Sequence, residues 1–285
     1  MVKTNLYKRA IQFVYNRNTQ LSLIFLSILL LTINFLGIAF PPQEIPDRSQ
    51  KQSAISGYDY TLRSNTELLS LLESPVTEFN IDQINNLIYE SIFHSDKRFI
   101  DIQENWLLWS LGQLYPPLAR IQNPKRIIEG GGGLCSEVTA VFNEIAMKNN
   151  YETRFIDVNG HVVAEIKMPD GWKVVDPDYG ISYDYDRQTL EGPQGASIIS
   201  RQLASRNFSK DVINAYIAYF QSIEDNTTSP INQAISPRLY WVETTTEWLK
   251  WIIPITLFLF GYQLMQRSRK TRPTRMPNIP QEATI

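Results

Sequence analysis

Cysteine and histidine are scarce in this chain: its 285 residues include one cysteine, Cys135, and two histidines, His94 and His161. A single cysteine cannot form a disulfide within the chain, which excludes the small disulfide-stapled scaffolds of secreted proteins. Two histidines and one cysteine that lie far apart in the sequence do not form the ligand spacing of a zinc site. We therefore expect no metal site and no cofactor.

Two further absences argue against nucleotide and nucleic-acid functions. The glycine run at residues 130–133 is not followed by the Lys-Ser/Thr pair of a phosphate-binding loop. Residues 43–247 contain 17 Lys and Arg against 28 Asp and Glu, which gives this segment a net charge of −11. A nucleic-acid-binding domain carries the opposite sign, so we expect no nucleic-acid partner.

Two long hydrophobic runs stand near the ends of the chain. Residues 21–40 contain no charge, and a helix of that length rises about 30 Å, the thickness of a bilayer core. Residues 251–265 form a shorter run with an internal proline, Pro254, which membrane helices tolerate. Tryptophans just before this run are typical of a membrane interface. We expect both runs to cross a membrane and to contact its lipids.

The charges beside these runs predict their orientation. Basic residues flank them on the sides of the chain ends: Lys3, Lys8, Arg9 and Arg17 before the first, and Arg267, Arg269, Lys270, Arg272 and Arg275 after the second. Because Lys and Arg accumulate on the cytoplasmic side, we expect both termini in the cytoplasm and the middle of the chain outside. A cleaved signal peptide is the alternative interpretation of the first run, since Gly37 and Ala39 could precede a cleavage site. The long charged leader favours an uncleaved anchor.

These features divide the chain into successive segments. They are a cytoplasmic leader (1–20), a transmembrane helix (21–41), a linker (42–65), an extracytoplasmic domain (66–223), a second linker (224–247), a second transmembrane helix (248–266) and a basic cytoplasmic tail (267–285). The linkers are predicted from their proline-rich or Asn/Thr/Ser-rich composition.

Within the domain, the hydrophobic period changes from helical to strand-like. Apolar residues recur near a 3.6-residue period through residues 66–117, and a helix is predicted to begin near Leu134 or Cys135 and to end near residue 150. Alternation then predicts strands at residues 153–158, 161–168 and 172–175, joined by tight Asn-Gly and Pro-Asp-Gly turns. Residues 181–210 show little regular pattern, and residues 211–223 are typical of a surface helix. A helix followed by an antiparallel meander predicts an α+β domain.

Cys135 has the surroundings of a reactive thiol. It stands at the expected N-terminus of a helix, where free N–H groups and the helix dipole favour a thiolate. The glycines before it permit close approach of a substrate and leave N–H groups that could hold an oxyanion. A thiolate nucleophile works best beside an imidazole that an acceptor holds in place.

His161 and Asp176 can supply that imidazole and that acceptor. We take the second turn to place Met168 opposite Gly171. His161 and Asp176 then share one face of the sheet as diagonal neighbours, about 7–8 Å apart between backbones. Asp178 has the same parity and is the alternative orienting group, and a one-residue bulge would destroy the arrangement.

Residues 130–180 resemble the core of transglutaminase-like proteins. The family pattern is a Gly-x-Cys that enters a helix, an Arg before a strand, a His that opens the next strand, and a Trp shortly before Asp-Pro. This sequence has these residues in the same order: Gly133, Cys135, Arg154, His161, Trp172, Asp176 and Pro177. The resemblance implies a papain-like α+β core, with the Cys-bearing helix packed on an antiparallel sheet and a transmembrane helix on either side.

The resemblance also implies roles for the reacting groups. Cys135 would be the nucleophile, His161 the general base and acid, and Asp176 the group that orients His161. The short spacing from Cys135 to His161 is closer to the peptide N-glycanase branch than to the large cross-linking enzymes, whose calcium-bearing extra domains have no counterpart here. Protein cross-linking is therefore not implied.

Three residues are candidates for oxyanion or substrate contacts: Gly133, Trp109 and Trp172. Trp109 lies upstream, where the family often supplies an aromatic N–H, although packing in the core is the simpler interpretation. His94, the other histidine, is interpreted as a residue at a helix end and not as a base.

The expected function is that of a cysteine hydrolase or acyltransferase anchored at the cell envelope. Cys135 would attack an amide carbonyl of a peptide or protein substrate to give a thioester, which water or an amine then resolves. The alternative is a catalytically inactive domain of the same fold that binds a peptide or a protein, with other membrane proteins as partners.

Overall fold

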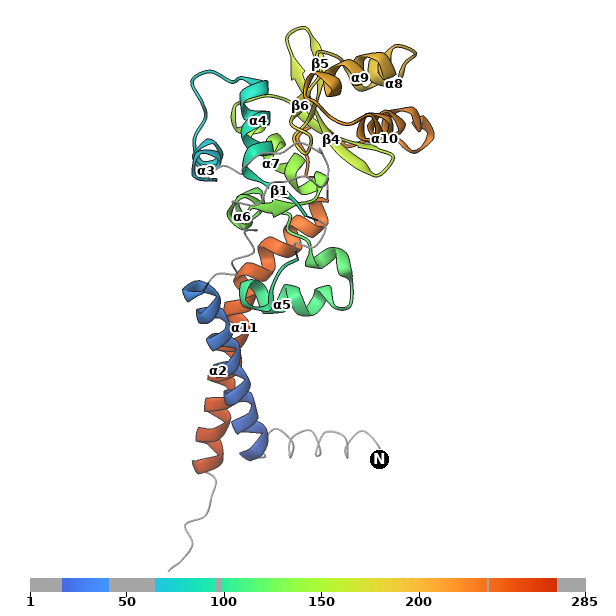
Figure 1. Cartoon of the computed structure of the whole chain (residues 1–285). Helices are drawn as coiled ribbons and strands as arrows, with labels where there is room; N and C mark the ends of the chain where they lie inside the picture. Colours follow the sequence, from blue (N-terminus) through green and yellow to red (C-terminus); the bar gives the residue numbers. More distant parts are fainter. Residues whose placement is uncertain (1–16, 41–64, 96–98, 235, 271–285) are drawn as a thin grey trace, which may run out of the picture. The chain divides into compact units, whose positions relative to one another are not determined.

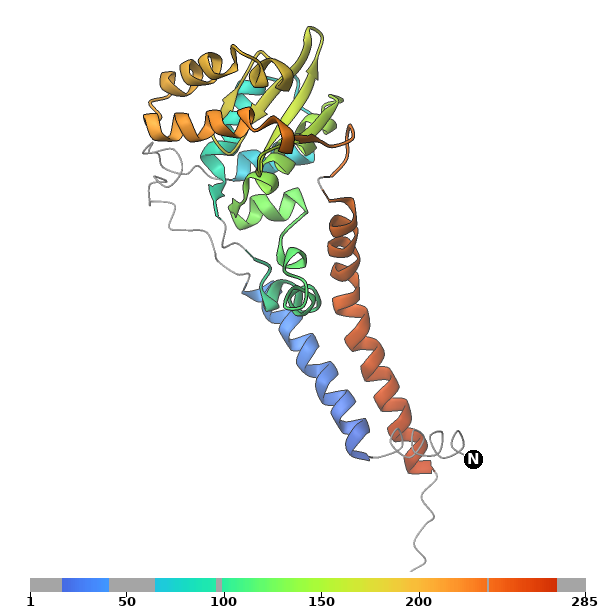
Figure 2. The ribbon, with the colours of Figure 1, turned by 90° about the vertical axis from the view of Figure 1, so that its right-hand side faces the viewer.

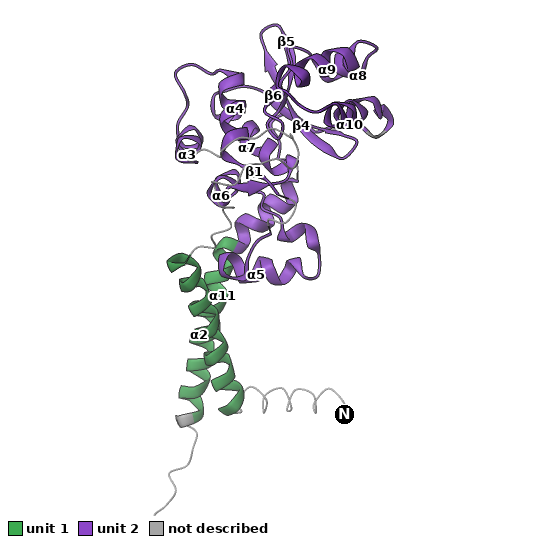
Figure 3. Cartoon of the chain, in the orientation of Figure 1, with its two compact units in different colours: residues 1–40, 247–285 green, residues 41–246 purple. Residues whose placement is uncertain are grey.

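The computed structural model describes residues 17–40, 65–95, 99–234 and 236–270. The chain divides into two compact units (Figure 3): residues 1–40 with 247–285 form one, and residues 41–246 form the other. Parts of three predicted segments lie outside the described residues, namely 1–16 of the leader, 42–64 of the first linker and 271–285 of the basic tail.

The first unit contains helix α2 (Arg17–Ala39) and the apolar part of helix α11 (Pro237–Lys270), the blue and red helices of Figure 1. Among the described residues, these two helices are long and apolar enough to cross a membrane. Only 11% and 17% of their most apolar windows are buried, so neither resembles the core helix of a soluble domain. The expectation of two membrane-length helices is confirmed.

Polar side chains join the two helices where their apolar surfaces meet. Three buried polar residues stand seven positions apart on α2: Gln20, Ser27 and Asn34. Pro254 has no N–H, so the carbonyl of Lys250, one turn earlier in α11, lacks its usual helical donor. Asn34 Nδ2 donates to that carbonyl at 2.7 Å, and Ser27 Oγ donates to the Pro254 carbonyl at 2.6 Å. These contacts explain how α11 accommodates a proline within an apolar segment.

The second unit is built on a five-stranded antiparallel sheet. Its strands are β3 (Thr153–Val158), β4 (His161–Met168), β5 (Gly171–Asp176), β6 (Ile181–Ser182) and β7 (Thr227–Thr228), in the order β6-β5-β4-β3-β7. The three predicted strands are confirmed, as is the pairing of Met168 with Gly171. Asn159 and Gly160 have φ of 51° and 84°, the positive values that a two-residue hairpin turn requires.

Helices surround this sheet and complete an α+β fold, as predicted. They are α3 (Thr66–Glu73), α4 (Ile81–Ser91), α5 (Ile102–Gly112), α6 (Pro124–Gly130), α7 (Cys135–Lys148), α8 (Arg187–Glu191), α9 (Gly195–Ser205) and α10 (Lys210–Gln221), with short 3-10 turns at Pro116–Ala119 and Ile223–Asp225. A two-stranded parallel pair, β1 (Phe93–His94) and β2 (Gly132–Gly133), lies before α7. The predicted start of the Cys135 helix is confirmed.

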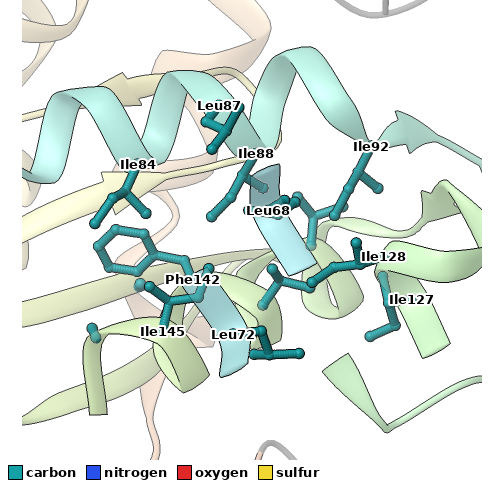
Figure 4. Close-up of a cluster of buried hydrophobic side chains, with 14 of the residues drawn as sticks. Leu68, Leu72, Ile84, Leu87, Ile88, Ile92, Ile127, Ile128, Phe142 and Ile145 are labelled. Atoms are coloured by element: carbon teal, nitrogen blue, oxygen red, sulfur yellow. The ribbon is translucent and has the colours of Figure 1, made fainter. Parts of the chain in front are cut away.

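The two faces of the sheet bury two separate hydrophobic clusters. Ala164 and Ile166 face the cluster of α3, α4, α6 and α7, and Figure 4 shows Phe142 of α7 beside Ile84 of α4 in it. Val163 faces the other cluster, which α9 and α10 cover (Figure 2). Successive strand residues point to opposite faces, so an antiparallel sheet can carry helices on both sides.

One sequence-based expectation about the C-terminal half of the domain is wrong. Residues 181–210 hold two helices, α8 and α9, where little regular pattern was expected. Helices α8 and α9 are short and carry few apolar residues each, so their pattern is weak until the sheet supplies a partner. The predicted surface helix is confirmed as α10, which exposes one face and buries Ile213, Tyr216 and Phe220 on the other.

Candidate active site

The first residue of β4 and the last residue of β5 meet at one end of the sheet. His161 Nε2 lies 2.6 Å from Asp176 Oδ2. Both side chains are buried, His161 at 5% and Asp176 at 0% exposure. The Met168–Gly171 register sets this contact, because it keeps the two residues on one face of the hairpin. The predicted neighbourhood of His161 and Asp176 is confirmed.

Asp176 receives four hydrogen bonds and is therefore held in one orientation. Its Oδ2 accepts from His161 and from the Tyr216 hydroxyl of α10 at 2.8 Å. Its Oδ1 accepts from the backbone N–H groups of Asp178 and Tyr179 at 2.9 and 3.2 Å. Burial, followed by the charge of Asp176, raises the pKa of Tyr216 well above its usual value, so this phenol stays protonated and remains a donor. A buried carboxylate needs this degree of satisfaction.

Aromatic rings enclose the imidazole of His161. The Tyr219 ring stacks on it at a centroid distance of 5.0 Å, and the rings of Tyr179 and Tyr216 meet it edge-on at 5.4 and 5.8 Å. Such packing fixes the ring plane and excludes water. Tyr216 and Tyr219 come from the helix that sequence analysis placed at the surface, which is why they were not predicted as site residues.

His161 is favoured in its charged form. Burial lowers its pKa, but the charge and hydrogen bond of Asp176, followed by the hydrogen bond and charge of Cys135, raise it well above the ordinary value. Asp176 occupies Nε2, which leaves Nδ1 as the other ring nitrogen of His161. Cys135 is close enough to His161 to contribute to the raised pKa of the imidazole.

Cys135 is the first residue of α7, and its side chain is partly exposed. The first helical hydrogen bond runs from Val138 N–H to Leu134 O at 2.9 Å. Earlier N–H groups of the first turn have no acceptor within the helix, and such groups attract negative charge. The backbone N–H of Cys135 itself is therefore a candidate oxyanion donor.

Glu137 and Gly133 shape the entry to this helix. Glu137 Oε2 accepts the Leu134 N–H at 2.7 Å, which fixes the turn before Cys135. A Cβ at Gly133 would stand 3.0 Å from Glu137 Cβ, so a larger residue would displace that cap. The structure thus gives Gly133 a packing reason to be glycine, and it lies two residues from the thiol.

A second His–Asp pair lies beside the first. His94 Nδ1 lies 2.8 and 2.9 Å from the two carboxylate oxygens of Asp178, a residue only 4% exposed. His94 pairs with Gly133 in the parallel β1–β2 ladder, which brings the second imidazole to the segment that leads into Cys135. Asp178, the alternative orienting group for His161, holds His94 instead. His94 does not end a helix but belongs to β1, which corrects that expectation.

The two candidate tryptophans, Trp172 and Trp109, lie on β5 and α5. Trp172 pairs with Lys167, at the far end of the hairpin from His161, and its ring lies under the Arg154 guanidinium at 4.3 Å. The same register that joins His161 to Asp176 therefore separates Trp172 from them along the hairpin. Trp109 lies on α5 at 36% exposure, and no ring contact or side-chain hydrogen bond joins it to Cys135 within the described residues.

Among the described residues, no group of three His, Cys, Asp or Glu side chains is arranged to hold a metal ion. No protein-family model matches the chain, and no curated protein matches it in sequence.

Proposed function

We propose that this protein is a membrane-anchored, transglutaminase-like cysteine enzyme that cleaves or transfers amide-linked acyl groups through a thioester. The observation that carries the proposal is the position of His161, which hydrogen-bonds Asp176 through Nε2 and also interacts with Cys135. A fixed acceptor, an imidazole and a thiol at a helix N-terminus form the chain of contacts that nucleophilic catalysis by cysteine requires.

The fold supports the same proposal. In transglutaminase-like proteins the cysteine begins a helix, the histidine opens a strand and the aspartate ends the next strand. Cys135 begins α7, His161 opens β4 and Asp176 ends β5. Helix α7 packs on the sheet, and Thr139 Oγ1 of this helix donates to the Val162 carbonyl of β4 at 3.0 Å.

The reaction follows from the protonation states. The Cys135 thiolate attacks the carbonyl carbon of an amide, and the backbone N–H of Cys135 stabilises the oxyanion that forms. The C–N bond breaks as the His161 imidazolium gives its proton to the departing amine, which leaves an acyl thioester. Water or a second amine then attacks, His161 removes its proton, and the thiolate returns with release of an acid or a new amide.

The proposed location is the outer side of a membrane, with both ends of the chain in the cytoplasm. Helices α2 and α11 have the length and the composition to cross a bilayer. The basic residues that flank them favour this orientation, and four of these residues belong to the described part: Arg17, Arg267, Arg269 and Lys270. Peptides or protein side chains of the cell envelope are then the accessible substrates.

The two histidines provide a matched test of the proposed chemistry. We would measure the second-order rate of Cys135 alkylation by iodoacetamide near neutral pH in the full chain, reconstituted in lipid nanodiscs. His161→Ala should lower this rate by about 100-fold, because the thiolate loses its imidazolium. His94→Ala removes the other imidazole, which is also held by a buried aspartate, and should change the rate by less than about threefold.

Equal rates in the wild type and His161→Ala would reject the enzymatic proposal and favour a binding module of the same fold. If alkylation does depend on His161, the acyl group can be captured from membranes as a thioester on Cys135 and identified by mass spectrometry. Cys135→Ser is the matched control for this capture, because an adduct on another residue would persist in that variant.

A further inference from the structure

A pocket lies next to the candidate active site and shares one residue, Tyr179, with the aromatic enclosure of His161. Its volume is about 340 Å³, and it lies between α4 and the residues that end and follow α9, all within the second unit. A hollow of this size suits one side chain or one terminal residue of a peptide. Cys135, His161 and Asp176 do not line it, so the pocket is an addition to the reacting groups.

Tyr179 joins this pocket to the proposed reacting groups. Its ring meets the His161 imidazole edge-on at a centroid distance of 5.4 Å, and its backbone N–H donates to Asp176 Oδ1 at 3.2 Å. Burial raises the pKa of the Tyr179 phenol, and the charges of neighbouring groups, Cys135 among them, add to this rise. The thiol is therefore within electrostatic range of the ring. A substrate whose amide lies at the thiol has the pocket within reach of its next groups.

Three aromatic rings form a firmly packed wall of the pocket. The Phe208 ring lies against the Tyr179 ring at a centroid distance of 5.7 Å. Gly180 has a φ of 65°, and a Cβ at this position would stand 2.7 Å from Tyr89 Cγ, so the glycine lets the Tyr89 ring approach the turn that carries Tyr179. The three rings are each 7% exposed. Such contacts hold the wall in place, as a preformed binding site requires.

Arg206 brings a charge to this pocket that the chain itself does not pair. The other half-buried arginines of the described domain each have a partner within the chain: Arg120, Arg126, Arg154 and Arg187. Arg206 is half-buried as well, but no ion pair or side-chain hydrogen bond engages its guanidinium among the residues that the structure describes. Its nitrogens do not belong to the buried polar atoms, so a ligand can reach them. Glu90 also lines the pocket, but it already has an interaction within the chain.

We propose that this pocket binds a carboxylate of the substrate through the guanidinium of Arg206. A guanidinium presents a planar fork of N–H donors that matches a carboxylate, and such charge-assisted hydrogen bonds are stronger in a partly desolvated place than in water. The rings of Tyr89, Tyr179 and Phe208 then pack against the carbon chain that carries the carboxylate. The inference rests on the proposed function and narrows its substrates to peptides with a carboxylate near the amide that Cys135 attacks.

The test uses three alkylating reagents of nearly the same size. N-iodoacetyl-glutamine amide is neutral, N-iodoacetyl-glutamate α-amide carries a side-chain carboxylate, and N-iodoacetyl-glutamine carries a terminal carboxylate. The second-order rate of Cys135 labelling is measured for each in the full chain in nanodiscs and divided by the rate for iodoacetamide, which removes differences in the thiol itself. At least one acid should react about tenfold faster than the neutral reagent. The faster acid shows whether the pocket takes an acidic side chain or a chain terminus.

Variants of two arginines separate the pocket from the general charge of the surface. Arg206→Gln should reduce the roughly tenfold preference for the acid to about onefold. Arg206→Lys keeps the charge without the planar fork and should retain a preference of about threefold. Arg201 is the matched control, because it is exposed on α9 and does not line the pocket. Arg201→Gln removes the same charge and should keep the full preference.

Several outcomes would overturn the proposal. They are equal rates for the acids and the neutral reagent, a preference that Arg206→Gln keeps, and a preference that Arg201→Gln loses to the same extent. A faster reaction of N-iodoacetyl-lysine amide, lost in Glu90→Gln, would assign the pocket to an ammonium group instead. Iodoacetamide has no carboxylate, so the dependence of its rate on His161 tests the proposed enzyme, whereas the ratio of acid to neutral reagent tests the pocket alone. The two failures are therefore distinguishable.

Discussion

The β4–β5 hairpin buries a carboxylate at each of two places, and the two carboxylates have different partners. Glu165, in the middle of β4, binds Arg154 of β3 through contacts of 2.7 and 2.6 Å and accepts the Arg187 N–H at 2.7 Å. Asp176, at the end of β5, binds His161, a tyrosine hydroxyl and backbone N–H groups. Both carboxylates are fully buried.

The two carboxylates differ in whether their cationic partner can release its proton. Arginine does not release its proton in a protein, so the Arg154–Glu165 pair is a fixed link between β3, β4 and the start of α8. Histidine can exchange its proton near neutral pH, and His161 interacts with Cys135 as well as with Asp176. One hairpin therefore holds a structural ion pair in its middle and, at one end, an ion pair suited to proton transfer.

The largest expected effect separates these two carboxylates by the same chemical change. Asp176→Asn should slow Cys135 alkylation by about 100-fold, because a neutral carboxamide does not stabilise the imidazolium electrostatically and can turn its NH2 group toward the ring, which favours the wrong tautomer. Glu165→Gln should change the rate by less than about twofold. Rate constants from mass spectrometry of the labelled chain give the measurement. Similar losses in both variants would mean that alkylation reports only the integrity of the hairpin.

The second prediction concerns the stability of the domain and the Arg154–Glu165 pair, whose variants should have little effect on alkylation. Arg154→Met leaves Glu165 buried without its cation, and the domain should lose about 2–3 kcal/mol of unfolding free energy. The value is toward the low end for a broken buried pair, because the Arg154 side chain is 28% exposed. Chemical unfolding followed by near-UV circular dichroism measures it. Adding Glu165→Leu should recover part of the loss, and a double variant no better than the single would contradict this account.

Sequence patterns predicted the central part of the fold because it is local. The three strands of the meander follow one another with tight turns, and residues such as Asn159 and Gly160 mark those turns in the sequence. Helices α8 and α9 escaped prediction, and α10 was assigned to the surface. Their burial depends on a sheet face that is formed by distant strands, which a short apolar pattern does not reveal.

The contacts of the candidate site likewise divide into those that the sequence predicted and those that it did not. His161 and Asp176 are 15 residues apart on neighbouring strands. The alternation of side chains along the two strands was therefore enough to predict that they are neighbours. Tyr216 reaches Asp176 from 40 residues away, and His94 reaches Asp178 from 84 residues away. The hydrophobic period of a helix or a strand does not predict contacts between residues so far apart in the sequence. The sequence did contain one signal for the second pair. Two aspartates, Asp176 and Asp178, flank Pro177 in a chain that has two histidines.

The third prediction sharpens the comparison through pH. The pKa of His161 is raised in the folded chain, so its charged form stabilises the fold fully below the ordinary value of 6.5, and this stabilisation is lost as the pH rises through the raised value. The difference in unfolding free energy between the wild type and His161→Gln should therefore shrink on the alkaline side. Chemical unfolding of the wild type and His161→Gln at a series of pH values gives the two stability curves, and a difference that does not change with pH would show that His161 does not titrate with folding.

The smallest expected effect tests the tyrosines that surround the imidazole. Tyr216→Phe removes the hydroxyl that donates to Asp176 Oδ2 and keeps the ring, which should cost about 1 kcal/mol of stability and slow alkylation by roughly three- to fivefold. Tyr219→Phe is the matched control, since its ring stacks on His161 at 5.0 Å and this contact does not need the hydroxyl. Its alkylation rate should stay within about twofold of the wild type. A larger loss in Tyr219→Phe than in Tyr216→Phe would move the orienting role from the hydrogen bond on Asp176 to the aromatic enclosure. His161 would then be held by the packing of aromatic rings, whereas Glu165 is held by its ion pair with Arg154.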